Sequence, residues 1–263
     1  LAVVVLTLAG VLFYRTCLRH SEFVILSTND MHASLDNVAR LATAVEECRD
    51  TVFTIVVDAG DRWTGNAYVD LAEGRKPIIR LMNVIGYDVA ALGNHDFDPG
   101  QQVLDEAIGS SEFAYLCANM TSEGKWLRGV EASKRIVTPD GVAIDFVGVV
   151  TSYSNGHPDG NDNNFEGLKF EDPQVVAERE CGASNGDVKV LLSHMGHDRD
   201  LALAAQYGGY DIILGGHTHK VLDTLVNGTV LGQTGRKLKN VGVTKVKMRG
   251  KRVVSVEYEN VPL

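Results

Sequence analysis

The stretch Ala90-Ala91-Leu92-Gly93-Asn94-His95-Asp96-Phe97-Asp98 begins as an apolar strand, reaches a glycine, and then presents an amide, an imidazole and carboxylates. Strands of a mixed α/β sheet carry their ligand-binding groups at their carboxyl ends, so polar residues at this point indicate a site. Asn94 offers a carbonyl oxygen to a cation, and Asp98 can reach back to the ring of His95 if the chain turns there. Taken alone, the stretch could also be a strand-to-helix turn capped by Asn or Asp.

Four other apolar runs end in the same kind of polar cluster. A single histidine after a strand is more often a hydrogen-bonded loop residue than a ligand, but five such endings in one chain favour a common site. The four additional endings are Asn29-Asp30-Met31-His32 after residues 23–27, Asp58-Ala59-Gly60-Asp61 after 53–57, Ser193-His194 after 188–192, and Gly215-Gly216-His217-Thr218-His219 after 211–214.

Strand and helix patterns alternate through the first half of the chain, which predicts an α/β fold that opens as βαβαβα. After His219 the pattern changes to strands only, and it ends in a half-exposed hairpin over residues 241–258. The helices are expected over residues 38–48, 77–85, 100–108, 172–180 and 198–206, and further strands over 113–117 and 143–150, with a hairpin turn at Pro139-Asp140-Gly141.

Length and charge restrict the class of protein. The 263 residues, 44% of them hydrophobic, are enough for one large domain with a sizeable core. The net charge of −9 argues against a binder of nucleic-acid polymers, because affinity for the phosphate backbone requires a basic surface. A small phosphorylated substrate stays compatible with this charge, since bound divalent cations reverse the local potential.

The first 14 residues, LAVVVLTLAGVLFY, are apolar throughout. This run is too short to span a membrane as written, but it has the length of the apolar region of a signal peptide. We therefore expect residues 1–20 to be an apolar leader, either a signal peptide or a membrane anchor, with a first core strand as the alternative. The leader predicts an exported, periplasmic or outward-facing membrane-anchored protein, with a cytoplasmic location as the alternative. The four cysteines form no CxxC pair and do not settle the compartment.

The polar residues at the strand ends supply oxygen and imidazole ligands without a thiolate. Asp30 and His32 lie two residues apart on a segment that we expect to be extended, so that both side chains point the same way, and the same is expected of His217 and His219. Asp61 can bridge two ions through its two oxygens. Such a set favours Zn, Mn, Fe, Co or Mg over copper or an iron–sulfur cluster. Two such cations, about 3.5 to 4 Å apart, can clamp an in-line displacement at phosphorus.

The order of these motifs resembles the calcineurin-like metallophosphoesterases. The longer spellings Ser27-Thr28-Asn29-Asp30-Met31-His32 and Gly93-Asn94-His95-Asp96-Phe97-Asp98 are similar to its 5′-nucleotidase and UDP-sugar hydrolase branch, and the resemblance covers about residues 23–262. It implies the metallophosphatase fold, a four-layer α/β/β/α sandwich of two mixed sheets flanked by helices. It also implies a two-metal phosphoesterase acting on nucleotides, as a 5′-nucleotidase or a 2′,3′-cyclic phosphodiesterase, by attack of a metal-activated water on phosphorus.

The same resemblance assigns roles to individual residues. His95 would contact the transferring phosphoryl group, and Asp98 would orient its ring. Two divalent cations of unspecified identity would share Asp61, one bound by Asp30, His32, Asp61 and His219, and the other by Asp61, Asn94, His194 and His217.

Two features of the sequence leave alternatives open. Nucleotidases of this branch continue into a second domain that holds the base, whereas this sequence ends at Leu263, so we expect a catalytic domain over residues 21–263 without a C-terminal nucleotide-binding domain. A separately encoded nucleotide-binding domain would then be one partner, and a membrane bound through residues 1–14 would be another.

The long polar segment 152–164 is either an active-site flap or an exposed insertion. The alternative functions are a related two-metal hydrolase acting on a non-nucleotide anion and a non-catalytic metal-binding scaffold, although the intact motifs favour catalysis.

Overall fold

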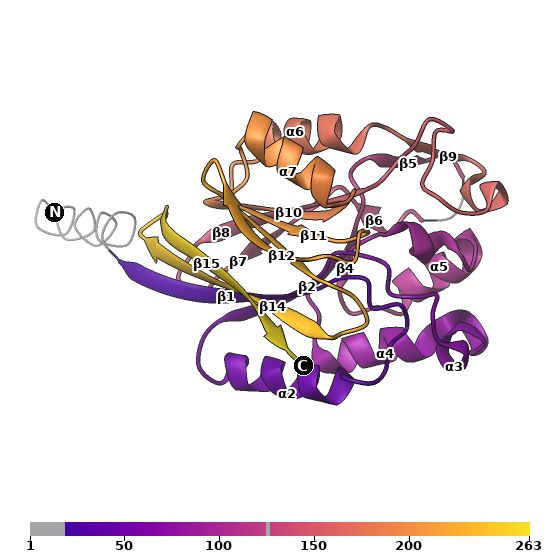
Figure 1. Ribbon diagram of the computed structural model, residues 1–263, viewed down its shortest axis with the longest axis horizontal. Helices are drawn as coiled ribbons and strands as arrows, with labels where there is room; N and C mark the ends of the chain where they lie inside the picture. Colours follow the sequence, from indigo (N-terminus) through magenta and orange to yellow (C-terminus); the bar gives the residue numbers. More distant parts are fainter. Residues whose placement is uncertain (1–18, 125–126) are drawn as a thin grey trace, which may run out of the picture.

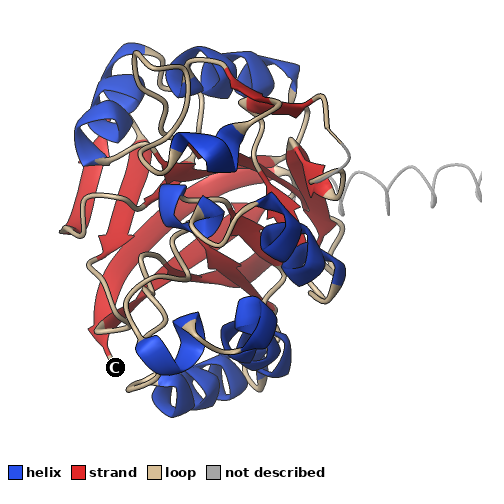
Figure 2. Cartoon of the chain, turned by 90° about the vertical axis from the view of Figure 1, so that its right-hand side faces the viewer, coloured by secondary structure: helices blue, strands red, loops and turns tan. Residues whose placement is uncertain are grey.

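The computed structural model describes residues 19–124 and 127–263, and these residues form two β-sheets packed face to face with helices on both outer faces (Figure 1). Viewed from the side in Figure 2, most of the helices lie above and below the strands, and further helical segments lie in front of the strands at mid-height. The expected leader over residues 1–20 falls almost entirely outside the described residues. Among the described residues, no helix combines the length and apolar character needed to cross a membrane.

The first sheet contains the three predicted βα units and has the strand order β15-β14-β1-β2-β3-β4-β6. Strands β1 to β4 and β6 run parallel to their neighbours, while β14 joins β1 antiparallel and β15 joins β14 antiparallel. Its elements are β1 (His20–Thr28), α2 (Val38–Arg49), β2 (Thr54–Asp58), α3 (Ala67–Asp70), η2 (Glu73–Arg75), α4 (Lys76–Ile85), β3 (Val89–Ala91), η3 (Asn94–Phe97), α5 (Gln101–Gly109), β4 (Ala114–Leu116), β6 (Val130–Glu131), β14 (Asn240–Arg249) and β15 (Arg252–Pro262).

The second sheet has the order β12-β13-β11-β10-β8-β7, with parallel pairs in its centre and an antiparallel pair at each edge. A separate two-stranded ribbon pairs β5 with β9. The elements of this half are β5 (Met120–Ser122), β7 (Ser133–Val137), β8 (Ala143–Val150), η4 (Asp162–Phe165), β9 (Leu168–Phe170), α6 (Pro173–Ala183), β10 (Val188–His194), α7 (His197–Gln206), β11 (Ile212–Gly215), β12 (Val221–Val226) and β13 (Thr229–Thr234).

Successive side chains of β1 alternate between two hydrophobic clusters, which explains why its sequence is a continuous apolar run. Phe23 and Ile25 point into the core between the two sheets, where they join Phe146 of β8. Val24 and Leu26 point the other way and pack in the cluster formed with α2, α4 and α5. A third cluster lies between the second sheet and the helices α6 and α7. Both faces of the central parallel strands are therefore covered, whereas antiparallel strands such as β12 and β14 keep a solvent-exposed face, and the predicted four-layer α/β/β/α sandwich is confirmed.

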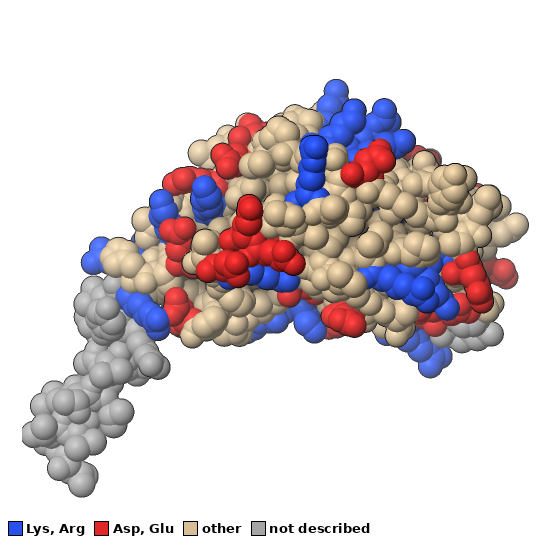
Figure 3. All heavy atoms as spheres, turned by 90° about the horizontal axis from the view of Figure 1, so that it is seen from below, with Lys and Arg blue, Asp and Glu red and all other residues tan. Residues whose placement is uncertain are grey.

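The predicted helices and main strands are present, with ends that move by at most four residues. Asp172 caps α6 by accepting hydrogen bonds from two backbone amides of the first turn, and Pro77 lies in the first turn of α4. The short elements α3, β5, β6 and β9 are not predicted by the sequence, because two to four residues are too few to show a period. On the face seen in Figure 3, Lys and Arg are interspersed with Asp and Glu rather than gathered into one basic surface.

The core between the sheets yields the first prediction, which concerns Phe146. This side chain is completely buried, so Phe146→Ala should lower the free energy of unfolding by about 3 to 5 kcal/mol through lost burial and a residual cavity. As a control, Val84→Ala on the outer face of α4, where the residue is 86% exposed, should change it by less than about 0.5 kcal/mol. Urea denaturation followed by circular dichroism measures both. Equal midpoints for the two variants would contradict the assigned core.

Candidate functional site

The loops after β1, β2 and β3 of the first sheet meet the loops after β10 and β11 of the second sheet at one edge of the sandwich. Glycines allow this convergence. Gly60 has a φ of +97°, and a Cβ added there would come within 2.6 Å of the Gly93 nitrogen and 2.8 Å of His194 Nδ1. A residue with a side chain would therefore be strained at position 60 and would force the loops apart. The five polar endings singled out in the sequence belong to a single site.

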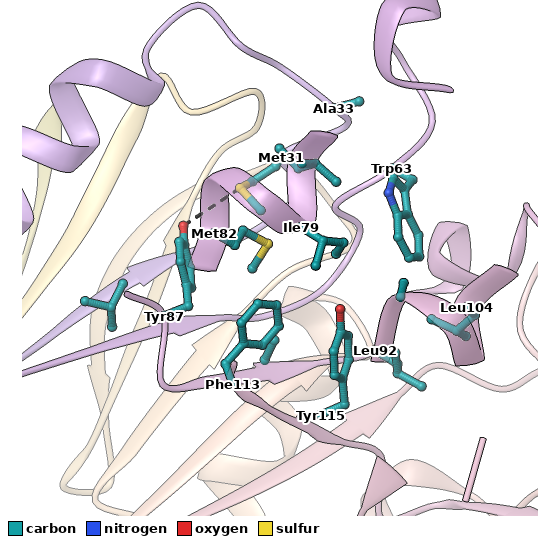
Figure 4. Packing of buried hydrophobic residues seen from close by; sticks show 14 of the residues in the cluster. Met31, Ala33, Trp63, Ile79, Met82, Tyr87, Leu92, Leu104, Phe113 and Tyr115 are labelled. Carbon is teal, nitrogen blue, oxygen red and sulfur yellow. Dashed lines mark hydrogen bonds between the residues drawn. The ribbon is translucent and has the colours of Figure 1, made fainter. Parts of the chain in front are cut away.

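Apolar residues next to the polar ones anchor these loops in the core. Met31 and Trp63 are both buried in the cluster between the first sheet and its helices, and Figure 4 shows them pointing into it. The hydroxyl of Tyr87 lies 3.8 Å from the sulfur of Met31. Because Met31 lies between Asp30 and His32, the core fixes the backbone that carries both candidate ligands.

The prediction that the Asp-x-His and His-x-His segments are extended is wrong. The φ angles of Asp30, His32, His217 and His219 are 48°, 47°, 75° and 55°, all in the left-handed region. Contacts across the site impose this conformation: the amide of Asp30 donates to the Gly60 carbonyl at 2.9 Å, and the amide of His217 donates to Asp30 Oδ2 at 3.0 Å. The side chains still converge, but through loop geometry rather than strand alternation.

Three of the predicted ligands form a first group of donor atoms. The Nε2 atoms of His32 and His219 lie 2.8 Å apart, and His219 Nε2 lies 3.4 Å from Asp30 Oδ1. His32 Nδ1 faces the carbonyl of Thr64 at 3.0 Å, so a proton on Nδ1 leaves the lone pair of Nε2 free. Two imidazoles and a buried carboxylate, all within 4.8 Å of one another, are able to hold a divalent cation.

A second group consists of Asp30, Asp61 and His194. His194 Nδ1 lies 2.6 Å from the carbonyl of Ala59, so Nδ1 donates and Nε2 faces the carboxylates. His194 Nε2 is 3.1 Å from Asp61 Oδ2, yet it is a buried atom without a hydrogen-bond partner of acceptable geometry. An orphaned imidazole nitrogen between two buried carboxylates fits a metal ligand.

The last two predicted ligands, Asn94 and His217, face each other beside the second group. His217 Nδ1 lies 3.0 Å from Asn94 Oδ1. The structure thus brings together all seven predicted ligands. In this arrangement Asp30 belongs to both three-residue groups, whereas the resemblance made Asp61 the shared residue. Asp61 has one oxygen toward His194, while the other accepts the backbone amide of His95 at 2.8 Å.

The ring of His95 lies at the opening of the site, and its position is fixed by a hydrogen bond to Asp98. Asp98 Oδ2 is 2.8 Å from His95 Nδ1, and the hydroxyl of Thr64 donates to the same oxygen at 2.5 Å. The side chain of His95 is 38% exposed, in contrast to the buried Asp30, Asp61 and His194. The hydrogen bond to Asp98 raises the pKa of His95, which favours the protonated ring at the opening of the site.

Burial and charge shift the pKa values of the interior groups in opposite directions. Burial alone would lower the pKa of His194, but the adjacent Asp61 carboxylate outweighs it and raises the pKa to about 10. Burial would likewise raise the pKa of Asp61, yet His194 holds it well below its usual range. Burial, followed by the nearby His194, lowers the pKa of His217, whose ring is therefore neutral at pH 7. The carboxylate of Asp61 is therefore ionised and available to a cation.

A buried ion-pair network beneath the ligands was missed in the sequence analysis. The Arg62 guanidinium lies 3.2 Å from Asp58 Oδ1 and 3.1 Å from Asp96 Oδ2, and all three side chains are inaccessible to solvent. Asp96 also accepts the backbone amides of Gly93, Asp61 and Arg62 at 2.8, 3.2 and 3.1 Å. The sequence does contain an indication of this network: Asp58, Arg62 and Asp96 lie close to predicted ligands at the ends of apolar strands. Charged side chains that are buried at such positions must pair with one another.

Comparison with known proteins adds three findings. The family described as calcineurin-like phosphoesterase matches residues 23–221. The trifunctional nucleotide phosphoesterase protein YfkN of Bacillus subtilis is 28% identical over 281 residues, covering 91% of this chain and 19% of that protein. The 5′-nucleotidase of Bos taurus is 30% identical over 228 residues, covering 77% of this chain and 39% of that protein. The chain therefore spans well under half the length of these relatives.

A solved structure agrees with the fold. The 5′-nucleotidase precursor from Thermus thermophilus superposes with a TM-score of 0.79 at 22% sequence identity, covering 92% of this chain and 54% of that chain. At this identity the likeness shows the fold alone. It supports the metallophosphatase fold that the sequence resemblance implied.

The buried network yields the second prediction. Arg62→Met should lower the free energy of unfolding by about 3 to 5 kcal/mol, because it leaves the buried carboxylates of Asp58 and Asp96 without their counter-charge. The matched control is Arg179→Met, which removes an exposed ion pair with Glu171 and should leave stability close to that of the parent protein. Guanidinium denaturation measures both. A midpoint for Arg62→Met equal to that of the control would show that the network contributes no stability.

Proposed function

The chain belongs to the calcineurin-like phosphoesterase family, and we propose that it is a metal-dependent hydrolase of phosphate esters, with nucleotides as the substrate class. The observation that carries this proposal is the convergence, at one edge of the sandwich, of seven oxygen and imidazole donors with a hydrogen-bonded His–Asp pair. Donors of this type suit hard or borderline divalent cations, and a protonated imidazole at the opening suits a phosphoryl group. Nucleotide phosphoesterases and 5′-nucleotidases among the relatives support the substrate class.

Two cations are proposed, in the sets that the motif order implied. His32 and His219, whose Nε2 atoms are 2.8 Å apart, would hold one cation with Asp30. His194, Asn94 and His217 would hold the other. Asp61 is proposed as the shared ligand because the motif order implied it; one of its oxygens lies 3.1 Å from His194 Nε2, and the other accepts the backbone amide of His95. When bound, two divalent cations would activate a water molecule and neutralise charge on the phosphoryl oxygens.

Side chains of the protein are proposed to supply the proton and to orient its donor. His95 would hold a proton close to a phosphoryl oxygen or to the leaving oxygen, and Asp98 would keep its ring in place through the 2.8 Å hydrogen bond. Thr64 donates to the same oxygen of Asp98 and helps to orient it. His95 lies outside both groups of candidate ligands, which supports a role in the transition state rather than in binding a metal.

Recognition of the base would need residues other than Phe165. This ring is only 4% exposed, and it is stacked on His157 with the ring centroids 4.4 Å apart. Residues outside this sequence, in a further domain or in a partner domain, are proposed to hold the base. An exported or membrane-attached location is also proposed, and it rests on the apolar residues 1–14, which lie outside the described part of the chain.

The third prediction tests the shared ligand. Asp61→Ala should abolish phosphate release from AMP and lower the metal content of the purified protein towards zero, because two cations would then repel each other without a bridging charge. Asp50→Ala, at an exposed residue that follows α2, is the control and should retain the metal content and activity of the parent protein. Elemental analysis with a phosphate-release assay measures both quantities. Retention of two metals per chain by Asp61→Ala would defeat the bridging assignment.

The fourth prediction separates His95 from the ligands. His95→Asn should keep the full metal content but lower kcat for AMP and 2′,3′-cyclic AMP by about 10² to 10⁴, the usual contribution of a positioned acid or charge stabiliser. His20→Asn, at the exposed beginning of β1, should change neither quantity. Loss of metal from His95→Asn would make His95 a ligand, and an unchanged kcat would remove it from the reaction.

A further inference from the structure

The segment 152–164 reaches the candidate site at both of its ends. Near its beginning, the hydroxyl of Tyr153 lies 3.1 Å from His217 Nε2. At its end, the side-chain amide of Asn164 donates to the carbonyl of Asp98 at 3.3 Å. These two contacts favour an element of the active site over an exposed insertion.

The backbone fixes the position from which Tyr153 reaches the ring of His217. The amide of Thr151 donates to the carbonyl of His194 at 3.0 Å, which ties the start of the segment to the end of β10. A turn follows in which the amide of Gly156 donates to the carbonyl of Tyr153 at 2.9 Å. Tyr153 is thus held two residues beyond an anchor on a candidate ligand, although its side chain is 44% exposed.

The two nitrogens of His217 have different partners, and these partners determine where the ring proton lies. Nδ1 is 3.0 Å from Asn94 Oδ1, which can only accept a hydrogen bond, so Nδ1 donates in the arrangement seen here. Nε2 then carries the lone pair and accepts from the Tyr153 hydroxyl at 3.1 Å.

A cation bound by both Asn94 and His217 Nδ1 would require the other tautomer. The lone pair would have to be on Nδ1, and the ring proton on Nε2. One proton would leave Nδ1 for solvent and one would be taken up at Nε2, so the charge of the ring would not change. The Tyr153 hydroxyl can serve both states, because it can turn from donor to acceptor.

We propose that Tyr153 is a positioning residue of the metal centre. Its hydroxyl forms a hydrogen bond with His217 Nε2 in both tautomers, so that Nδ1 can replace its hydrogen bond to Asn94 by a bond to a divalent cation. Without the hydroxyl, the hydrogen bond from Nδ1 to Asn94 would persist in the metal-free state, while Nε2–H would lose its acceptor in the loaded state. The proposal rests on the metal site of the proposed function.

The experiment compares Tyr153→Phe with Tyr68→Phe, which removes a tyrosine hydroxyl from a residue that is 88% exposed on α3. Zn²⁺ is titrated into each metal-free protein in competition with a chromophoric chelator. We expect two Zn²⁺ per chain for the parent protein and for Tyr68→Phe with the same affinities. For Tyr153→Phe we expect the affinity of one of the two sites to fall by about 10- to 100-fold, the usual effect of removing the partner of a ligating histidine.

A spectroscopic measurement on the same samples distinguishes positioning from a general loss of structure. Long-range ¹⁵N–¹H NMR of the histidine rings should show the proton of His217 moving from Nδ1 to Nε2 when Zn²⁺ is added to the parent protein. In Tyr153→Phe this change should require more Zn²⁺, while the thermal midpoint of the metal-free protein should match that of the parent.

The outcomes separate this inference from the proposed function. Zn²⁺ affinities within threefold of one another for Tyr153→Phe and the parent protein would overturn the role of Tyr153 and leave the metal site intact. A His217 ring that keeps its proton on Nδ1 in the loaded protein would have the same meaning. A parent protein that binds no Zn²⁺ would overturn both proposals.

Discussion

The carboxylate of Asp96 accepts the backbone amides of Gly93, Asp61 and Arg62 and lies against the Arg62 guanidinium, all without contact to solvent. These hydrogen bonds join the loop after β2 to the loop after β3, and each loop carries candidate metal ligands. An ionised group buried at this depth is tolerated only when its lone pairs are satisfied, as they are here. The geometry of the site above therefore depends on a charge that never meets the substrate.

The same network separates the carboxylates of the region into two layers. Arg62 compensates Asp58 and Asp96 below, whereas the carboxylates of Asp30 and Asp61 above lie near imidazoles and accept backbone amides. The neighbouring Asp61 outweighs burial and raises the pKa of His194. A divalent cation bound by these residues would compensate the carboxylates of Asp30 and Asp61 directly.

The packing of two sheets accounts for the position of the site. Ligands on the first sheet come from the ends of β1, β2 and β3, and those on the second sheet come from the ends of β10 and β11 (Figure 1). Met31 and Trp63 carry the first-sheet loops into the core, so the ligands are fixed by packing as well as by hydrogen bonds (Figure 4). Rigid elements that converge from two sheets can hold donors to the tolerance that coordination and catalysis require.

The sequence by itself determined the strands, the main helices and the polar residues at the strand ends, because hydrophobic periodicity and strand-end chemistry are local properties. The motif order also implied the fold. The backbone conformation of Asp30 and His32 was predicted wrongly, since their left-handed φ angles are imposed by hydrogen bonds to residues about 30 positions away. Only the tertiary structure brings Asp96 beneath Asp61, and Tyr153 to His217 across 64 positions. Such contacts depend on how the loops of two sheets pack against each other, and no period in a single segment encodes that.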